Sequence, residues 1–351
     1  MVNLGASMIG LDGLPGVMRK HFQKRFGDGG AGLVLMQRYM PNYMHRSVKL
    51  TADGWDHCYI AFLCKKDGHY GLGGTTFWAS TGASTTISTR KGELGDEVSR
   101  FELWYAADKG GGKVELRVDN EDPVVVSTSA EALEDRWHEI DVEQGPHKIR
   151  VRALGPGRVR TYGVLLENDG PGVVWDQFSM LGAFTKRMLG WNEEHIAAQI
   201  KHRDPELIVF TYGGNDSRRV ALGKLTREEY AAEYTEAIRR VKAGKPEASC
   251  LIQGVHDRGK SLDYEIQGKD MEVLVEGQRD AAKASGCAFY DSYTAMGGAG
   301  SLEKWRKKSP PLAEPDMKHL NAAGREVLAT WTYEAIIAEY VKYRQAKAAA
   351  K

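Results

Sequence analysis

The chain has 351 residues, enough for roughly two domains of about 150 residues each. Hydrophobic residues make up 42% of it, charged residues 27%, and the formal net charge is +1, all ordinary for a globular protein. This balance argues against a nucleic-acid partner or a charged membrane surface, and no apolar run approaches the ~20 residues of a membrane span.

Four cysteines occur, at Cys58, Cys64, Cys250 and Cys287. Because none forms a CxxC pair and no histidines lie beside them at zinc spacing, we expect buried small hydrophobic side chains and no metal site. A bond between Cys58 and Cys64 in an oxidising compartment is an alternative that the sequence alone leaves open. The start at Met1 lacks the pattern of a signal peptide, so if the natural protein is exported, we expect its leader to have been removed.

Residues 1–38 predict a short strand, a turn and a helix. The helix has an apolar side chain at every fourth position and a glycine as its stop signal. These positions are Leu14, Met18, Phe22, Phe26 and Gly27.

From about residue 39 to about residue 170 the helical periodicity almost vanishes. Short alternating segments such as 113–118 and 148–152 are separated by Gly, Asp and Asn turns, for example at 155–157. This pattern predicts an antiparallel β-sandwich of about 130 residues.

Alternating strands and helices return after Val173. The near-continuous apolar run 206–212 predicts a strand buried on both faces, and further strands are expected around 173–174, 251–252 and 288–290. Thr226 and Glu229 form a capping box that opens a helix with one apolar face, and a last helix follows Asn321. We therefore predict a discontinuous α/β domain, residues 1–38 and 171–351, interrupted by a β-sandwich domain at 39–170.

Three short segments carry the chemistry of acyl transfer, which needs a nucleophile, a base, a group that orients the base and donors for an oxyanion. Ser7 ends Gly5-Ala6-Ser7, after the first strand and before a helix. Asn215 lies in Gly213-Gly214-Asn215-Asp216, directly after the buried strand. Asp316 precedes His319 by three residues and can orient its ring. Alone, Gly5-Ala6-Ser7 is more typical of an ordinary turn or helix cap. The segment 213–216 is as typical of a polar turn after a strand, and 316–319 is also typical of a cap at a helix start.

Together these segments resemble the SGNH hydrolase family, also called GDSL esterases, whose name gives Ser, Gly, Asn and His in chain order. Leu181-Gly182-Ala183 is similar to its second block. The resemblance covers about 1–38 and 173–345. It implies a flavodoxin-like three-layer αβα fold with a parallel sheet, and no cofactor.

The resemblance also implies roles. Ser7 is expected to attack the ester carbonyl, His319 to act as its base, and Asp316 to orient His319. The oxyanion hole is expected from the Ser7 and Gly182 N–H groups and the Asn215 side chain. The chain departs from the family at Ala6, where aspartate is usual, and at Met8, where relatives with a β insert often have a polar residue.

The inserted sandwich resembles the carbohydrate-binding-module-like domain of bacterial peptidoglycan O-acetylesterases and related polysaccharide deacetylases. This implies an acetylated glycan or a small ester as substrate and a periplasmic or extracellular location. The sandwich holds Trp55, Trp78, Trp104 and Trp137, of which we expect at least Trp104 and Trp137 in its core rather than stacked on sugars.

Two other functions remain open: a general carboxylesterase or lipase, and a catalytically weakened glycan-binding protein. His147 and His256 are more typical of structural positions than of catalysis. The segment His256-Asp257-Arg258 follows a strand, however, which makes it a candidate for the lining of the active-site cleft.

Overall fold

The computed structural model describes residues 1–91, 94–259 and 265–349. A five-stranded parallel sheet forms the centre of the α/β part. In spatial order its strands are β13 (Asp176–Ser179), β1 (Val2–Gly5), β14 (Leu207–Thr211), β15 (Ser249–Gln253) and β16 (Ala288–Tyr290). Numbered along the chain this is the flavodoxin-like order 2-1-3-4-5, which confirms the predicted fold class. The strand expected around 173–174 begins instead at Asp176, because Val173 forms an isolated bridge with Asp28.

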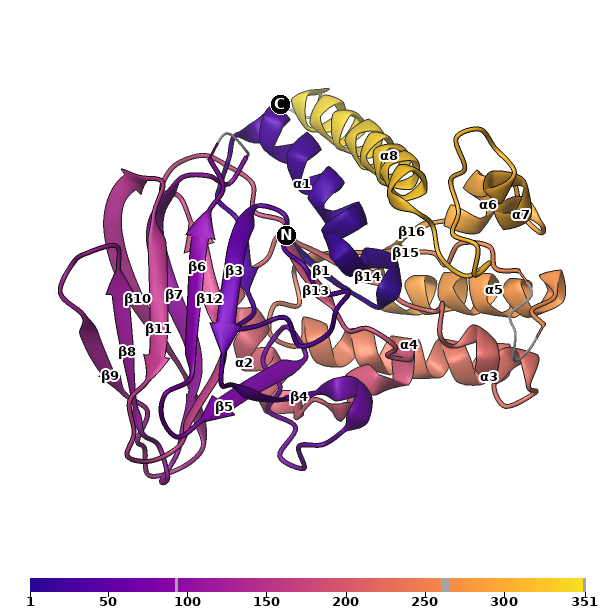
Figure 1. Cartoon of the computed structure of the whole chain (residues 1–351). Helices are drawn as coiled ribbons and strands as arrows, with labels where there is room; N and C mark the ends of the chain where they lie inside the picture. Colours follow the sequence, from indigo (N-terminus) through magenta and orange to yellow (C-terminus); the bar gives the residue numbers. More distant parts are fainter. Residues whose placement is uncertain (92–93, 260–264, 350–351) are drawn as a thin grey trace.

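Helices cover both faces of this sheet, as Figure 1 shows. One face carries α1 (Gly13–Phe26) and α8 (Ala322–Ala349), and the other carries α2 (Glu193–Arg203), α4 (Arg227–Lys242) and α5 (Gly268–Ser285). Alternate side chains of β14 point to opposite faces of the sheet. Val209 packs with α1 and α8, whereas Ile208 and Phe210 pack with α4. This alternation explains the unbroken apolar run that predicted β14.

Local signals place the helix ends where the sequence predicts them. Gly27 caps α1 with a φ of 99°, and Thr226 and Glu229 form the capping box of α4. Shorter helical segments connect the layers. These are η1 (Ser7–Asp12), η2 (Ile60–Phe62), η3 (Thr185–Gly190), α3 (Ser217–Ala221), α6 (Ser292–Met296) and α7 (Ser301–Arg306).

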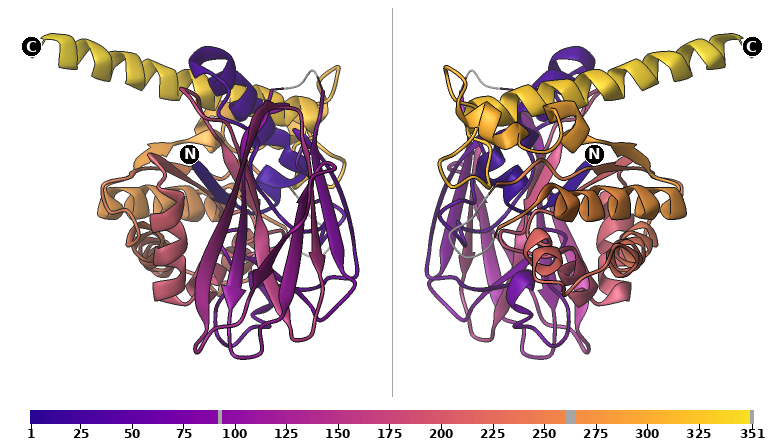
Figure 2. Two further views of the ribbon diagram at one scale, coloured as in Figure 1. Left: turned by 90° about the vertical axis from the view of Figure 1, so that its left-hand side faces the viewer. Right: turned by 90° about the vertical axis from the view of Figure 1, so that its right-hand side faces the viewer.

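Two antiparallel sheets form the sandwich beside the α/β part (Figure 2). The first contains β10 (Glu134–Gly145), β7 (Val98–Ala107), β12 (Val159–Glu167), β5 (Thr75–Ala79) and β4 (Asp56–Tyr59), with β2 (Gly32–Val34) also paired to β12. The second contains β3 (Val48–Asp53), β6 (Ser84–Thr89), β11 (Lys148–Ala153), β8 (Lys113–Val118) and β9 (Val124–Ser127). Because β2 lies within residues 1–38, the sandwich includes one strand that precedes the predicted insert in the sequence. The domain boundaries at 38/39 and 170/171 stay a prediction.

The first sheet of the sandwich packs directly on α2. Its face away from the sandwich core contributes Trp104 and Leu165 to the same apolar cluster as Ile196 of α2. Trp104 is fully buried, but in this contact with α2 and not in the sandwich core where we expected it, because its side chain lies on the other face of β7. Trp137 is only half-buried, because it lies at the edge of this contact, where its ring stacks on His202 of α2 at 3.9 Å between centroids.

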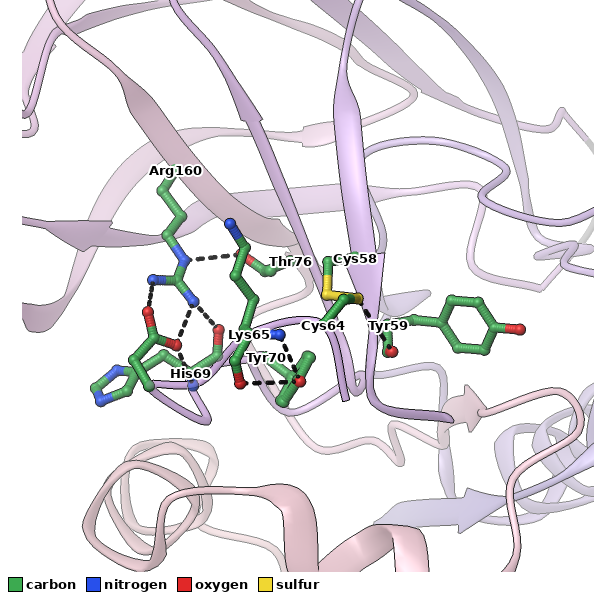
Figure 3. The surroundings of a disulfide bond; sticks show 9 residues. Cys58, Tyr59, Cys64, Lys65, His69, Tyr70, Thr76 and Arg160 are labelled. Atoms are coloured by element: carbon green, nitrogen blue, oxygen red, sulfur yellow. Dashed lines mark hydrogen bonds and ion pairs between the residues drawn. A yellow bond between two sulfur atoms is a disulfide. The ribbon is translucent and has the colours of Figure 1, made fainter. Parts of the chain in front are cut away.

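The expectation that the cysteines are unpaired buried side chains is wrong. Cys58 is bonded to Cys64 (Figure 3), and Cys250 to Cys287. The neighbouring strands β15 and β16 place the Cα atoms of Cys250 and Cys287 4.7 Å apart, within the range that a disulfide needs. Their 37-residue separation gives no sequence signal for this contact.

Candidate active site

Three loops that carry predicted site residues meet at one edge of the parallel sheet. Ser7 begins η1 directly after β1, Gly182 follows β13, and Asn215 follows β14. Because β1 lies between β13 and β14 and all three strands are parallel, the loops leave the same edge. The boundary between β1 and β14 is the switch point of the strand order, where open α/β folds bind their ligands.

Ser7, His319 and Asp316 form a continuous chain of hydrogen bonds. The Ser7 Oγ lies 2.9 Å from His319 Nε2, and His319 Nδ1 lies 2.6 Å from Asp316 Oδ2. The other oxygen of Asp316 accepts the backbone N–H groups of Lys318 at 2.9 Å and His319 at 3.0 Å. An acceptor-only carboxylate at Nδ1 fixes the proton there, so Nε2 is left to accept the proton of the Ser7 hydroxyl.

The loop that carries His319 is held by two groups of the loop that follows β15. The Gly259 N–H donates to Met317 O at 2.9 Å, and His256 Nε2 donates to Lys318 O at the same distance. His256 thus braces the loop that carries His319, while His147 bonds to Asp119 and to a backbone carbonyl within the sandwich.

Arg325, which the sequence analysis missed, fastens the start of α8 to η1. Its Nη1 donates to the Gly10 carbonyl at 2.9 Å. A lone arginine near the start of a long helix gave no signal of such a role.

The electrostatic surroundings keep His319 neutral and Asp316 ionised. Burial lowers the pKa of His319; the Asp316 carboxylate opposes this, and the positive charges of Arg258 and Arg325 lower the pKa further. Burial alone would raise the pKa of Asp316, but the hydrogen bonds from His319 and from backbone N–H groups outweigh it and lower that pKa. A neutral imidazole beside a carboxylate is the arrangement that a general base needs.

The remaining predicted residues lie on the neighbouring loops. Asn215 donates one Nδ2 hydrogen to Ala183 O at 2.9 Å, and its second amide hydrogen is left for another acceptor. Gly182 has a φ of +76°, a conformation that favours glycine. Gly213 has no room for a side chain, because a Cβ there would lie 2.7 Å from Tyr230 Oη. The oxyanion-hole roles of Ser7, Gly182 and Asn215 stay a prediction.

A small cavity opens beside Ser7. Its walls come from the ends of β1, β14 and β15: Ala6, Ser7, Met8, Thr211, Tyr212, Gly214, Val255, His256 and Arg258. The space in it measures about 10 Å³, which is room for roughly one water molecule or one methyl group. Met8 therefore forms a wall of this cavity.

Within the described parts of the chain, one group of side chains has the composition of a metal site: His69, Asp135 and His195, with ligand atoms within 4.8 Å of one another. His195 Nε2 accepts the Gly71 N–H at 2.9 Å, so its proton is on Nδ1, which lies 2.6 Å from Asp135 Oδ2. A metal at Nδ1 would displace that proton to Nε2, against the Gly71 N–H. The hydrogen bonds present therefore fit a contact between β10 and α2 better than a metal centre.

Residues 151–327 match the family model described as GDSL-like lipase/acylhydrolase, which is just over half of the 351 residues. The chain belongs to this family. Its members are carboxylic ester hydrolases, and so is this chain. Within this GDSL-like hydrolase, the matched range contains Gly182, Asn215, Asp316 and His319, while Ser7 lies ahead of it.

Comparison of structures shows the same fold in a peptidoglycan O-acetylesterase. The two superpose with a TM-score of 0.77 and 20% sequence identity, over 97% of this chain and 91% of that one. A lipase/acylhydrolase from Enterococcus faecalis matches over 47% of this chain and 76% of its own, with 17% identity and a TM-score of 0.37. An acetyl esterase matches over 48% of this chain and 74% of its own, with 15% identity and a TM-score of 0.35. No curated protein is similar enough in sequence to count as a match.

Proposed function

We propose that this GDSL-like hydrolase removes O-acetyl groups from a carbohydrate or cell-wall glycan through a Ser7–His319–Asp316 triad. The observation that carries the proposal is the hydrogen-bond chain from Ser7 Oγ to His319 Nε2, 2.9 Å, and from His319 Nδ1 to Asp316, 2.6 Å. These distances and the neutral His319 are what general-base activation of a serine requires.

The reaction has two halves. Ser7 Oγ attacks the acetyl carbonyl while His319 Nε2 takes the hydroxyl proton, and the same nitrogen then protonates the departing sugar oxygen. Water attacks the acetyl-serine in the same way and releases acetate. Asp316 holds the His319 tautomer and stabilises the imidazolium. The Ser7 and Gly182 N–H groups and the Asn215 amide are the proposed donors to the oxyanion, each worth ~10²–10³ in kcat.

The small cavity beside Ser7 favours an acetyl group over longer acyl chains. A space of about 10 Å³ walled by Met8, Tyr212 and Val255 accepts a methyl group but not a fatty chain. This counts against the lipase alternative, and the complete hydrogen-bond chain counts against a catalytically weakened binding protein.

A periplasmic or extracellular site of action fits the two disulfides, which persist in oxidising compartments. It also fits a cell-wall substrate of the kind named for the structural neighbour of 20% identity. Over the ranges the structure describes, no helix is long and apolar enough to cross a membrane.

The test is the release of p-nitrophenol from p-nitrophenyl acetate by the wild type and by Ser7→Ala. We expect Ser7→Ala to lose all but the background rate, with an unchanged melting temperature. Equal rates for the two proteins would overturn the proposal. Release of acetate from O-acetylated peptidoglycan then tests the glycan substrate.

A further inference from the structure

A second, larger groove lies where the sandwich meets the loop that follows Gly182. Its volume is about 410 Å³, the size of a small-molecule site. Its lining residues come from the η2 turn of the sandwich and from η3 and α3 of the α/β part. They are Leu63, Phe184, Lys186, Arg187, Leu189 and Arg219, together with Gly190.

This groove begins at the proposed oxyanion loops. Phe184 is two residues beyond Gly182, and the next residue, Thr185, donates its N–H and its hydroxyl to Asp216 Oδ2, each at 2.9 Å. Asp216 itself follows Asn215. One wall of the groove is therefore fixed to the loops that carry Gly182 and Asn215.

The groove is positively charged. Three cations, Lys186, Arg187 and Arg219, line it, against two carboxylates: Glu233 pairs with Lys186 at 3.3 Å and with Arg219 at 2.7 Å, and Asp216 pairs with Arg219 at 3.4 Å. The half-buried Arg187 has no ion pair or side-chain hydrogen bond to any residue that the structure describes. A half-buried guanidinium in this setting is well suited to a ligand carboxylate, which it can bind through two parallel hydrogen bonds.

The sandwich contributes Leu63 to the groove, from an exposed apolar turn that also carries Phe62. Phe62 is 72% exposed and Leu63 43% exposed. The Cys58–Cys64 disulfide closes this turn, and Tyr70 Oη bonds to both the N–H and the carbonyl of Lys65, at 2.9 and 3.1 Å (Figure 3). An exposed aromatic ring on a braced turn is a surface on which a sugar ring can stack.

We propose that this groove, which we call the η2–η3 groove, is a subsite for the glycan strand beside the acetylated sugar. Arg187 binds a carboxylate of that strand and Phe62 stacks on a sugar ring. The ligand is thus an anionic O-acetylated glycan such as peptidoglycan, whose peptide stems carry carboxylates. The inference rests on the proposed function and assigns the substrate's charge.

The test measures binding in the Ser7→Ala background, so that the ligand is not consumed. Soluble fragments of O-acetylated peptidoglycan are compared with the same fragments after their carboxylates have been converted to amides. We expect amidation, or Arg187→Gln, to raise the Kd about twofold to fivefold, as for a partly exposed ion pair. Amidation is expected to have no further effect on Arg187→Gln. Phe62→Ser is expected to weaken both forms of the fragments equally.

Arg117→Gln is the matched control, a half-buried arginine on β8 of the far sheet. A melting temperature of Arg187→Gln equal to that of the wild type shows that the variant folds. An unchanged Kd for Arg187→Gln, an equal loss for Arg117→Gln, or no binding of the fragments by the Ser7→Ala protein would overturn the subsite. Failure of the proposed catalysis would appear separately, as equal p-nitrophenyl acetate turnover by the wild type and Ser7→Ala.

Discussion

The size of the cavity beside Ser7 makes acyl-chain length a quantitative test of the site. The cavity has about 10 Å³ of space, enough for one methyl group. A butyryl ester carries two more methylene groups than an acetyl ester. One methylene in excess of what a pocket admits costs ~1–3 kcal/mol in transition-state binding, or ~10–200-fold in kcat/KM. We therefore expect p-nitrophenyl butyrate to react at least ~10-fold more slowly than the acetate.

Met8→Ala tests which side chain sets this limit. Met8 is a half-buried wall of the cavity, and truncating it removes atoms without removing a side-chain hydrogen bond. The ratio of butyrate to acetate kcat/KM should rise by about tenfold, because room for one or two methylenes is created. Met40→Ala is the control, since Met40 is a half-buried methionine packed against the sandwich core.

Steady-state kinetics on acetate, butyrate and octanoate esters of the same leaving group measure this directly. Wild-type protein that prefers butyrate or octanoate would refute the identification of this cavity as the acyl pocket. A ratio that changes equally in Met8→Ala and Met40→Ala would refute the role of Met8.

Three further outcomes are expected. Asp316→Asn should lower kcat by ~10⁴, because an amide facing Nδ1 no longer fixes the His319 tautomer, and an unchanged melting temperature would exclude unfolding as the cause. The acid limb of kcat/KM should lie below pH 6.5, because His319 works as the neutral base and its pKa is lowered from that value; Arg258→Gln should move the limb to higher pH, and movement to lower pH would contradict the charge argument. In guanidinium unfolding, removing the Cys250–Cys287 bond, which spans 37 residues, should cost about 4 kcal/mol of unfolding free energy. Removing Cys58–Cys64, which spans 6, should cost about 2 kcal/mol, and the reverse ranking would argue against the chain-entropy origin of the effect.

The sequence predicted those features that rest on local periodicity. The apolar run at 206–212 predicted a doubly buried strand, and the capping box at Thr226 placed the start of α4. Contacts between distant segments left no such signal. The Cys250–Cys287 bond depends on the adjacency of β15 and β16. The η2–η3 groove depends on the way the sandwich meets the loop after Gly182.

The same division holds within the candidate site. The order of the four blocks predicted Ser7, Gly182, Asn215 and His319, and the structure brings Ser7 and His319 within 2.9 Å. The brace from His256 to the Lys318 carbonyl is a side-chain-to-backbone contact across 62 residues. Such contacts carry no residue-type pattern, so sequence reasoning placed His256 near the cleft without its role.

Ala6 lies where the resemblance to the family leads us to expect aspartate, directly before the proposed nucleophile. The structure holds the turn through its backbone. The Ala6 N–H donates to Thr211 O at 3.2 Å, and Ser179 Oγ donates to the Ala6 carbonyl at 3.4 Å. The Ala6 side chain is 4% exposed. An aspartate at this place would bring a buried charge that needs its own partners. Because β14 and β13 hold Ala6 from both sides, the turn that aims Ser7 at His319 does not depend on a carboxylate, and the departure is compatible with a working nucleophile.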